Sequence, residues 1–198
     1  MTMEKNNPAS PGRSQRQSLI YVTLTALFAG LIGAGTFIAL PLPGSPVPIV
    51  LQNMFALLAG LILGPALGAA SAGLFLLAGI LGAPVFAGAS GGIARLLGPT
   101  GGFLAGYPLM AATAGLIAGT PRPDRPTSAG RLILGIAAGL ASVYVPGLIR
   151  LKFALDYSWP ETVLAGCLPF LPGDAIKGLA AGCIAPRLRR AAAEHLHG

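Results

Sequence analysis

Apolar residues occur along the chain in six long segments, which short polar or glycine- and proline-rich stretches separate. Within each segment the apolar residues are continuous and do not alternate with polar ones, which favours helices over the strands of a membrane barrel. Several segments approach the roughly 20 residues that a membrane-spanning helix needs. The predicted spans cover residues 19–40, 49–63, 66–81, 100–119, 130–153 and 172–188. We therefore predict an all-α membrane protein with six transmembrane helices.

The stretches between the spans set the domain boundaries. The second and third spans meet at Gly64-Pro65, which makes this boundary the least sharp of the set. Residues 82–98 are rich in glycine, and residues 156–170 are of mixed polarity. We expect a polar tail at residues 1–18, a single membrane domain at 19–190 and a second tail at 191–198.

Composition excludes a soluble domain. The chain is 54% hydrophobic and 10% charged, whereas a soluble domain is usually about 25% charged. Glycine, with 29 residues, is abundant, as expected where helices pack closely in lipid. The two cysteines, Cys167 and Cys183, have no disulfide or metal spacing and are interpreted as small packing residues.

The basic residues predict the orientation of the spans. The net charge is +7, but no basic stripe with interleaved aromatic residues indicates nucleic-acid binding. Nine of the 13 basic residues would share one face of the membrane: Lys5, Arg13, Arg16, Arg122, Arg125, Arg131, Arg187, Arg189 and Arg190. Since cytoplasmic loops are enriched in Lys and Arg, both termini are expected in the cytoplasm. We expect a multi-pass protein of the bacterial cytoplasmic (inner) membrane.

Asp174 and Lys177 are the first candidates for a functional site. Ionisable groups at membrane depth are costly and usually face a cavity, a partner or a substrate. Asp174 follows Pro172-Gly173 and is predicted in the first turn of the last helix, with Lys177 on the same face. One interpretation is an acid at a helix N-terminus with a salt-bridge partner. The other is that both side chains point into a ligand cavity.

Arg95 is the single charge of the glycine-rich stretch 82–98. It could hold a carboxylate with its bidentate fork, or it could extend towards the external interface. Irregular glycine-rich backbone at membrane depth is tolerated where it lines a cavity. The stretch is therefore a candidate wall of a binding site.

Amide and aromatic side chains supply weaker candidates. Gln52 and Asn53 open the second span, where they could bind a ligand or could equally cap or cross-link helices. Tyr107 and Trp159 could cover a ligand ring. Tyrosine and tryptophan side chains in membrane proteins, Tyr144 included, are nevertheless more often interface anchors or packing residues.

Small residues four apart in the first span predict a close helix contact. The pairs are Ala26 with Gly30, Ala29 with Gly33, and Gly30 with Ala34. Such ridges let another helix approach closely. Packing inside the molecule is somewhat favoured over contact with a partner subunit.

The sequence predicts neither a cofactor nor an enzyme. Residues 98–102, Gly-Pro-Thr-Gly-Gly, lack the Lys-Ser/Thr ending of a nucleotide-binding loop. No pairing of Ser or Cys with His suggests a catalytic site, and His195 and His197 lie in the C-terminal tail. A membrane enzyme that acts on lipid would need a paired acid and base or a metal cluster, for which one Asp and one Lys are poor candidates.

Five motifs, taken together and in order, carry a family resemblance that runs from about Thr25 to Ala185. They are Pro46-Val-Pro-Ile-Val-Leu-Gln-Asn53, Leu58-Ala-Gly-Leu-Ile-Leu-Gly-Pro65, Gly79-Ile-Leu-Gly-Ala-Pro-Val-Phe86, Gly98-Pro-Thr-Gly-Gly-Phe103 and Leu168-Pro-Phe-Leu-Pro-Gly-Asp-Ala-Ile-Lys177. With these motifs the chain resembles BioY, the biotin-binding substrate-recognition (S) component of energy-coupling factor (ECF) vitamin transporters.

The resemblance implies high-affinity biotin recognition and uptake by a six-helix bundle with its pocket near the external face. By motif, it places Arg95, Asp174 and Lys177 in the site, with Tyr107 and Gln52 as further candidates. Our hypothesis is that Asp174 accepts a hydrogen bond from a ureido N–H. Either Lys177 or Arg95 would then neutralise the carboxylate.

The resemblance also implies partners. An S component works with a coupling transmembrane subunit and a pair of ATPases, so ATP hydrolysis would belong to separate subunits. The ridge of Ala26 and Gly30 is the nearest match to the family's small-residue contact with the coupling subunit, although Gly30 departs from the usual alanine. Membrane lipid is expected around the bundle, and a homo-oligomer is left open.

Three other functions compete with this one. The chain could be an S component for another vitamin or a self-sufficient secondary importer, and both would still be transporters. It could also be a structural membrane subunit, in which case substitutions of Arg95, Asp174 and Lys177 would leave uptake unchanged.

Overall fold

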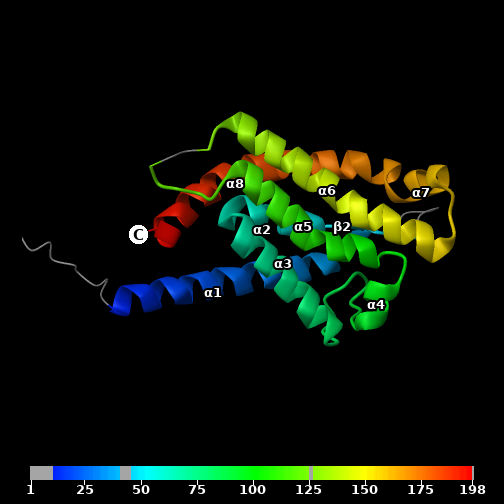
Figure 1. The fold of residues 1–198 in the computed structure, drawn as a ribbon, viewed down its shortest axis with the longest axis horizontal. Coiled ribbons are helices and arrows are strands. Elements are labelled where there is room, and N and C mark those ends of the chain that lie inside the picture. The colour runs from blue at the N-terminus through cyan, green and yellow to red at the C-terminus, as the bar shows by residue number, and fades with distance from the viewer. Residues whose placement is uncertain (1–10, 41–45, 125–126, 198) are drawn as a thin grey trace, which may run out of the picture.

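The computed structural model describes residues 11–40, 46–124 and 127–197 of the 198-residue chain. Lys5 and Arg125, members of two predicted basic clusters, lie outside these ranges, as does segment 41–45 of the proline-rich first loop. The elements, shown in Figure 1, are α1 (Pro11–Ala34), η1 (Gly35–Phe37), β1 (Ala39–Leu40), β2 (Ile49–Val50), α2 (Gln52–Leu63), α3 (Pro65–Ile80), α4 (Ile93–Leu97), α5 (Gly101–Ala118), α6 (Ala129–Leu155), α7 (Trp159–Gly166), η2 (Leu168–Phe170) and α8 (Leu171–His197).

Each predicted span overlaps one α-helix, in the predicted order. Four of these helices, α1, α5, α6 and α8, lie in stretches long and apolar enough to cross a membrane, and α2 and α3 are shorter apolar helices. The structure is thus mostly helical, with four helices that could cross a membrane. Within the described ranges, the strands form one two-stranded antiparallel ribbon, in which Ala39 faces Val50 and Leu40 faces Ile49.

The break between α2 and α3 has a backbone cause. Gly64 ends α2 with φ +86°, a left-handed conformation that favours glycine, and Pro65 begins α3 at a position where proline needs no N–H partner. The Gly64-Pro65 pair therefore turns one apolar stretch into two short helices. Of the two, α2 is buried along almost its whole length, from Ala56 to Leu63, and forms the centre of the core.

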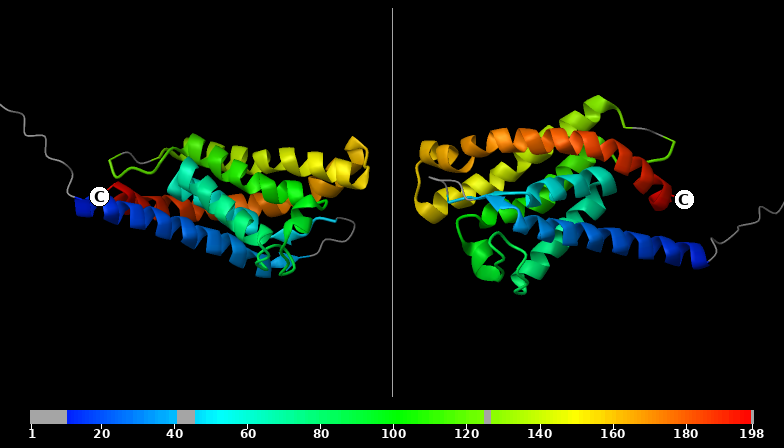
Figure 2. Two further views of the ribbon diagram at one scale, coloured as in Figure 1. Left: turned by 60° about the horizontal axis from the view of Figure 1, so that its bottom comes forward. Right: turned by 180° about the vertical axis from the view of Figure 1, so that it is seen from behind.

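Helices α5 and α6 pass each other at glycine positions. A Cβ added to Gly102 would collide with the carbonyl oxygen of Pro146, and one added to Gly147 would collide with the ring of Phe103. Small residues at a crossing let two backbones approach closely in lipid. The two helices thus form a closely packed pair, visible side by side in Figure 2.

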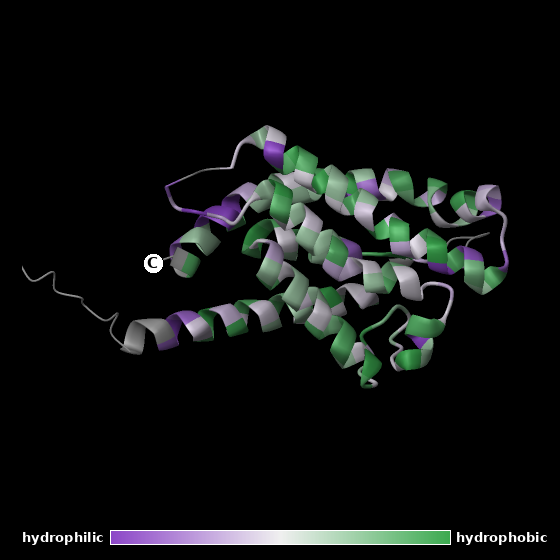
Figure 3. Cartoon of the chain, viewed as in Figure 1, coloured by the Kyte–Doolittle hydropathy of each residue, from purple (hydrophilic) through white to green (hydrophobic). Residues whose placement is uncertain are grey.

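Both ends of the described chain lie at the same end of the bundle (Figures 1 and 2). The hydroxyl of Tyr21 on α1 donates a hydrogen bond to the carbonyl oxygen of Leu196 on α8, at 3.1 Å. Both helices continue into the predicted polar tails, since α1 starts at Pro11 and α8 ends at His197. Figure 3 shows hydrophilic residues near this end and also near the α7 end, with mostly apolar residues along the helices between them.

Two segments that the sequence left irregular contain short helices. Residues 82–98 form an isolated bridge between Phe86 and Ser90, followed by α4. Residues 156–170 contain α7, whose start is fixed by a capping box in which Ser158 and Glu161 exchange hydrogen bonds. These segments lie at the end of the bundle opposite the termini (Figure 1).

Candidate functional site

A buried ion pair lies at the start of α8. Asp174 stands in the first turn of the helix, as predicted, and the Lys177 Nζ is 3.1 Å from its Oδ1. Both residues are buried, with 6% and 8% of their surface exposed. Two opposite charges three residues apart on a helix share a face. Here that face is turned into the protein, so the pair is not a surface salt bridge.

Asn53 and Tyr144 complete the hydrogen bonding of this pair. The Asn53 Nδ2 donates to Asp174 at 3.0 Å, its Oδ1 accepts from Lys177 at 2.9 Å, and the Tyr144 hydroxyl donates to Asp174 at 2.5 Å. The network therefore joins α2, α6 and α8. We had interpreted Tyr144 as an anchor or packing residue, and its hydroxyl in fact contacts the central carboxylate.

Two small adjoining cavities lie beside this network. The first, of about 50 Å³, is lined by Asn53, Tyr144, Asp174 and Lys177 among others. The second, of about 40 Å³, contains Gln52 and Arg95 in its wall. Five residues line both cavities: Val47, Pro48, Val50, Phe103 and Tyr107. We call these five residues the shared wall.

Adjacent positions on α2 serve the two cavities. Asn53 faces the first cavity and Gln52 the second. Gln52 is fully buried, and its Nε2 donates to the carbonyl oxygen of Val85 at 2.6 Å. Its Oε1 has no hydrogen-bond partner within the described part of the chain. A buried acceptor without a partner costs free energy, so this oxygen is suited to receive a donor from a ligand.

Arg95 lies on α4 and is exposed. Its Nη2 donates to the carbonyl oxygen of Ala87 at 3.3 Å, and among the residues described it has no carboxylate partner. The three predicted charges therefore do not form one cluster. Asp174 and Lys177 line one cavity, Arg95 lines the other, and the shared wall stands between the two.

A second arginine fixes the segment that carries Arg95. The Arg150 guanidinium, on α6, donates to the carbonyl oxygens of Leu97 and Gly98, the latter at 3.3 Å. These carbonyls form the end of α4, so the cation also meets the negative end of a helix. Sequence reasoning did not identify this contact, because nothing near position 150 indicates that the glycine-rich stretch lies beside it.

The small-residue ridges of α1 divide between the two faces of the helix. Ala29 is buried, and a Cβ added to Gly33 would lie 3.3 Å from Val85. Ala26 and Gly30 are exposed, and a Cβ added to Gly30 would meet nothing within 4 Å. We had favoured packing inside the molecule for these ridges. That prediction is correct for Ala29 and Gly33 but wrong for Ala26 and Gly30.

Comparison with known proteins decides the family. A family model described as the BioY family matches residues 6–194. The chain belongs to the BioY family. It is 36% identical over 164 residues to a biotin transporter BioY of Thermotoga maritima, with 83% of this chain and 92% of that protein covered. A Pyrococcus horikoshii protein named as a probable biotin transporter BioY is 39% identical over 168 residues, with 85% and 95% covered.

A solved structure shares the fold. The crystal structure of an S-component for biotin from an ECF-type ABC transporter superposes with a TM-score of 0.79 at 31% sequence identity. The match covers 96% of this chain and 95% of that one. The BioY resemblance seen in the motifs is thus confirmed over the whole membrane portion of the chain.

Proposed function

We propose that this BioY chain recognises biotin and brings it into the cell as the substrate-binding component of an ECF-type transporter. The observation that carries the proposal is the buried network of Asp174 and Lys177 beside a cavity. The adjoining cavity contains the Gln52 Oε1, which has no hydrogen-bond partner among the described residues. A mostly apolar pocket with a few placed polar groups is the usual form of a small-molecule site. Purification in detergent, followed by mass spectrometry of the released small molecules, tests it. Biotin in the wild type supports the proposal, and another vitamin in its place would refute it.

In the proposed topology, six spans cross the cytoplasmic membrane and both termini lie in the cytoplasm. The hydrogen bond between Tyr21 and Leu196 supports an even number of crossings, because it holds α1 and α8 together at one end. The segments at that end are the start of α1, the α5–α6 connection with the start of α6, and the end of α8. They contain the described basic residues Arg16, Arg122, Arg131, Arg187, Arg189 and Arg190. This bias favours the cytoplasm for the terminal end. The two cavities then face the outside, where the vitamin arrives.

We assign the ureido ring of biotin to the cavity beside Asp174. A ureido group has two N–H donors and one carbonyl acceptor, and this cavity offers both complements. Asp174 supplies carboxylate oxygens, while Lys177 and Asn53 supply N–H donors. Because Lys177 is already neutralised by Asp174, the pair suits a neutral polar ring better than a free carboxylate.

We assign the biotin carboxylate to Arg95. This guanidinium has a carbonyl partner but no acid partner among the described residues, so a ligand carboxylate would be its counter-ion. Guanidinium and carboxylate groups match in a two-bond geometry that strengthens the contact. Gln52 adds an acceptor in the same cavity, and Tyr107 reaches both ends of the ligand because it belongs to the shared wall.

Arg95→Gln tests the assignment of the two ends. We expect the affinity for biotin to fall by about 10- to 100-fold, the value of a hydrogen bond to a charged group. Biotinamide lacks the carboxylate and so makes no ion pair with Arg95 that the substitution could remove. Its affinity for the variant is therefore expected to stay within about twofold of its affinity for wild type. Titration calorimetry of both ligands measures the difference. Arg122→Gln, an exposed arginine at the terminal end, is the matched control. An equal loss for both ligands would assign Arg95 another role.

We propose that the exposed ridge of Ala26 and Gly30 contacts the coupling transmembrane subunit, which itself binds the ATPase pair. Two features support this surface. Its residues are small, and they face outward from α1 although the neighbouring Ala29 is buried. In lipid, a groove of small residues allows a partner helix to approach closely.

Gly30→Leu tests the partner surface. The added side chain meets nothing within the protein, so we expect biotin binding to be unchanged and co-purification with the coupling subunit to fall at least about tenfold, as steric separation of close-packed helices predicts. Gly130→Leu, at another position where a Cβ meets nothing, is the matched control. Undiminished assembly of the Gly30 variant would place the contact elsewhere.

A further inference from the structure

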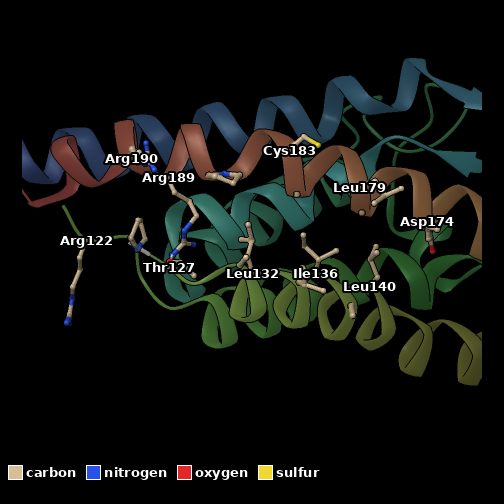
Figure 4. A pocket seen from close by; sticks show the side chains of 18 residues that line it. Arg122, Thr127, Leu132, Ile136, Leu140, Asp174, Leu179, Cys183, Arg189 and Arg190 are labelled. Carbon is tan, nitrogen blue, oxygen red and sulfur yellow. Dashed lines mark hydrogen bonds between the residues drawn. The ribbon is translucent and has the colours of Figure 1, made fainter. Parts of the chain in front are cut away.

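A long apolar groove runs between α6 and α8, and Asp174, at one of its ends, is the only residue that it shares with the proposed biotin site. Its volume is about 760 Å³. Leu132, Ile136 and Leu140 line it from α6, while Gly178 and Gly182 form its floor on α8. Figure 4 shows these α6 side chains pointing towards α8 along the length of the groove.

The groove is long in relation to a membrane. Its lining extends from Asp174 to Arg190 on α8, a rise of about 24 Å at 1.5 Å per residue. The hydrocarbon core of a bilayer is about 30 Å thick. Both α6 and α8 belong to stretches long and apolar enough to cross a membrane. In a bilayer, the groove would therefore face lipid along most of its length.

The groove is also narrow. A Cβ added to Gly178 would lie 3.1 Å from Ile136, and one added to Gly182 would lie 3.6 Å from the same side chain. Packed helices keep their axes 8–10 Å apart. A transmembrane helix of a second protein therefore cannot reach the floor, whereas a single hydrocarbon chain needs no such spacing.

The two ends of the groove differ in charge. At one end, the carboxylate of Asp174 is already bonded to Asn53, Tyr144 and Lys177. At the terminal end, Arg122 and Arg190 are exposed, and neither guanidinium has a hydrogen bond or an ion pair to another described residue. Arg189 also lines this end, but its guanidinium donates hydrogen bonds to carbonyl oxygens inside the protein. The groove is thus apolar along its length and cationic at the end where the membrane surface lies.

We infer that this groove binds an anionic phospholipid. One acyl chain lies along Ile136 and Gly182, and the phosphate lies at the terminal end of the groove, which Arg122 and Arg190 line. Juxtamembrane arginines attract anionic lipid headgroups, and the narrow apolar floor accepts a flexible chain but not a helix. The arginines at one end give the site a preference for an anionic headgroup, and the apolar floor contacts the acyl chain.

Native mass spectrometry of the whole protein in detergent, titrated with phosphatidylglycerol or with phosphatidylcholine of identical chains, tests the inference. We expect the wild type to bind phosphatidylglycerol more tightly. The double variant Arg122→Gln/Arg190→Gln is expected to bind phosphatidylglycerol about 30-fold more weakly, the value of two surface arginines. The double variant should then bind phosphatidylglycerol and phosphatidylcholine with equal affinity. Arg187→Gln, an exposed arginine of the same helix that does not line the groove, is the matched control.

A second variant tests the floor of the groove. Gly182→Leu fills it and is expected to weaken both lipids at least about fivefold through lost chain contact. Gly73→Leu, on α3 where a Cβ meets nothing, is expected to change neither. Biotin retained in the same spectra reports that the variants are folded. A wild type without biotin would refute the proposed function and leave the lipid result standing.

Three results would overturn the lipid site. The first is equal affinity of the wild type for the two lipids. The second is phosphatidylglycerol binding that the arginine variant leaves unchanged. The third is a dimer of the wild type that Gly182→Leu dissociates with no effect on lipid, because a second copy would then occupy the groove.

Discussion

Replacing Asp174 with alanine is expected to lower biotin affinity at least about 100-fold and to destabilise the bundle by about 3–5 kcal/mol, the cost of breaking a buried ion pair. The change leaves Lys177 charged, buried and without its counter-ion, and it removes the acceptor of Tyr144 and of Asn53. Titration calorimetry with biotin and thermal unfolding in detergent measure the two effects.

Removing both charges separates binding from stability. In the double variant Asp174→Asn/Lys177→Met no buried charge is left alone, so we expect it to recover most of the lost stability. Biotin affinity should stay low, since neither the carboxylate nor the ammonium is available to the ureido ring. Asp124→Asn, an exposed acid in the loop between α5 and α6, is the matched control. Wild-type affinity in the double variant would remove both residues from the site.

Arg189→Met is expected to destabilise the protein by about 4 kcal/mol, because several hydrogen bonds to a charged group are lost together. Its guanidinium, 5% exposed, donates to the carbonyl oxygens of Leu61, Ala118 and Gly119 and to the Thr127 Oγ1. These carbonyls belong to the ends of α2 and α5, where a cation is favoured. The free energy of unfolding, measured in detergent, checks the effect.

Two further variants define what Arg189 contributes. Arg189→Lys keeps the charge, but its compact ammonium lacks the planar fork that reaches separate acceptors. We expect it to lie between wild type and Arg189→Met. Arg187→Met, an exposed neighbour, should change stability by less than about 0.5 kcal/mol. Equal stabilities for the two methionine variants would show that the buried contacts of Arg189 are not needed.

The helices could be predicted from the sequence because each depends on a local pattern. Continuous apolar stretches predicted the positions of four helices long enough to cross a membrane and of the shorter apolar helices α2 and α3. The Gly64-Pro65 pair marked the break that the structure contains. The place of Asp174 in the first turn of α8 followed from Pro172-Gly173. Charge and apolar surroundings were enough to single out Lys177 as well, because an ionisable group at membrane depth is costly wherever it lies.

Partners distant in the sequence could not be predicted in the same way. Asn53 and Asp174 are 121 residues apart, and their hydrogen bond depends on how α2 and α8 pack. Arg189 was interpreted as a marker of the cytoplasmic side, yet it also joins two helix ends in the interior. The burial of Ala29 and the exposure of Ala26 likewise depend on the rotation of α1, which a spacing of four residues does not fix.

The shared wall between the two cavities makes binding at the proposed site depend on the length of the ligand. A molecule that reaches only Lys177, or only Arg95, gains one charged contact. A molecule long enough to extend past the shared wall gains both contacts. Chain length would therefore discriminate between analogues that carry the same ring and the same acid.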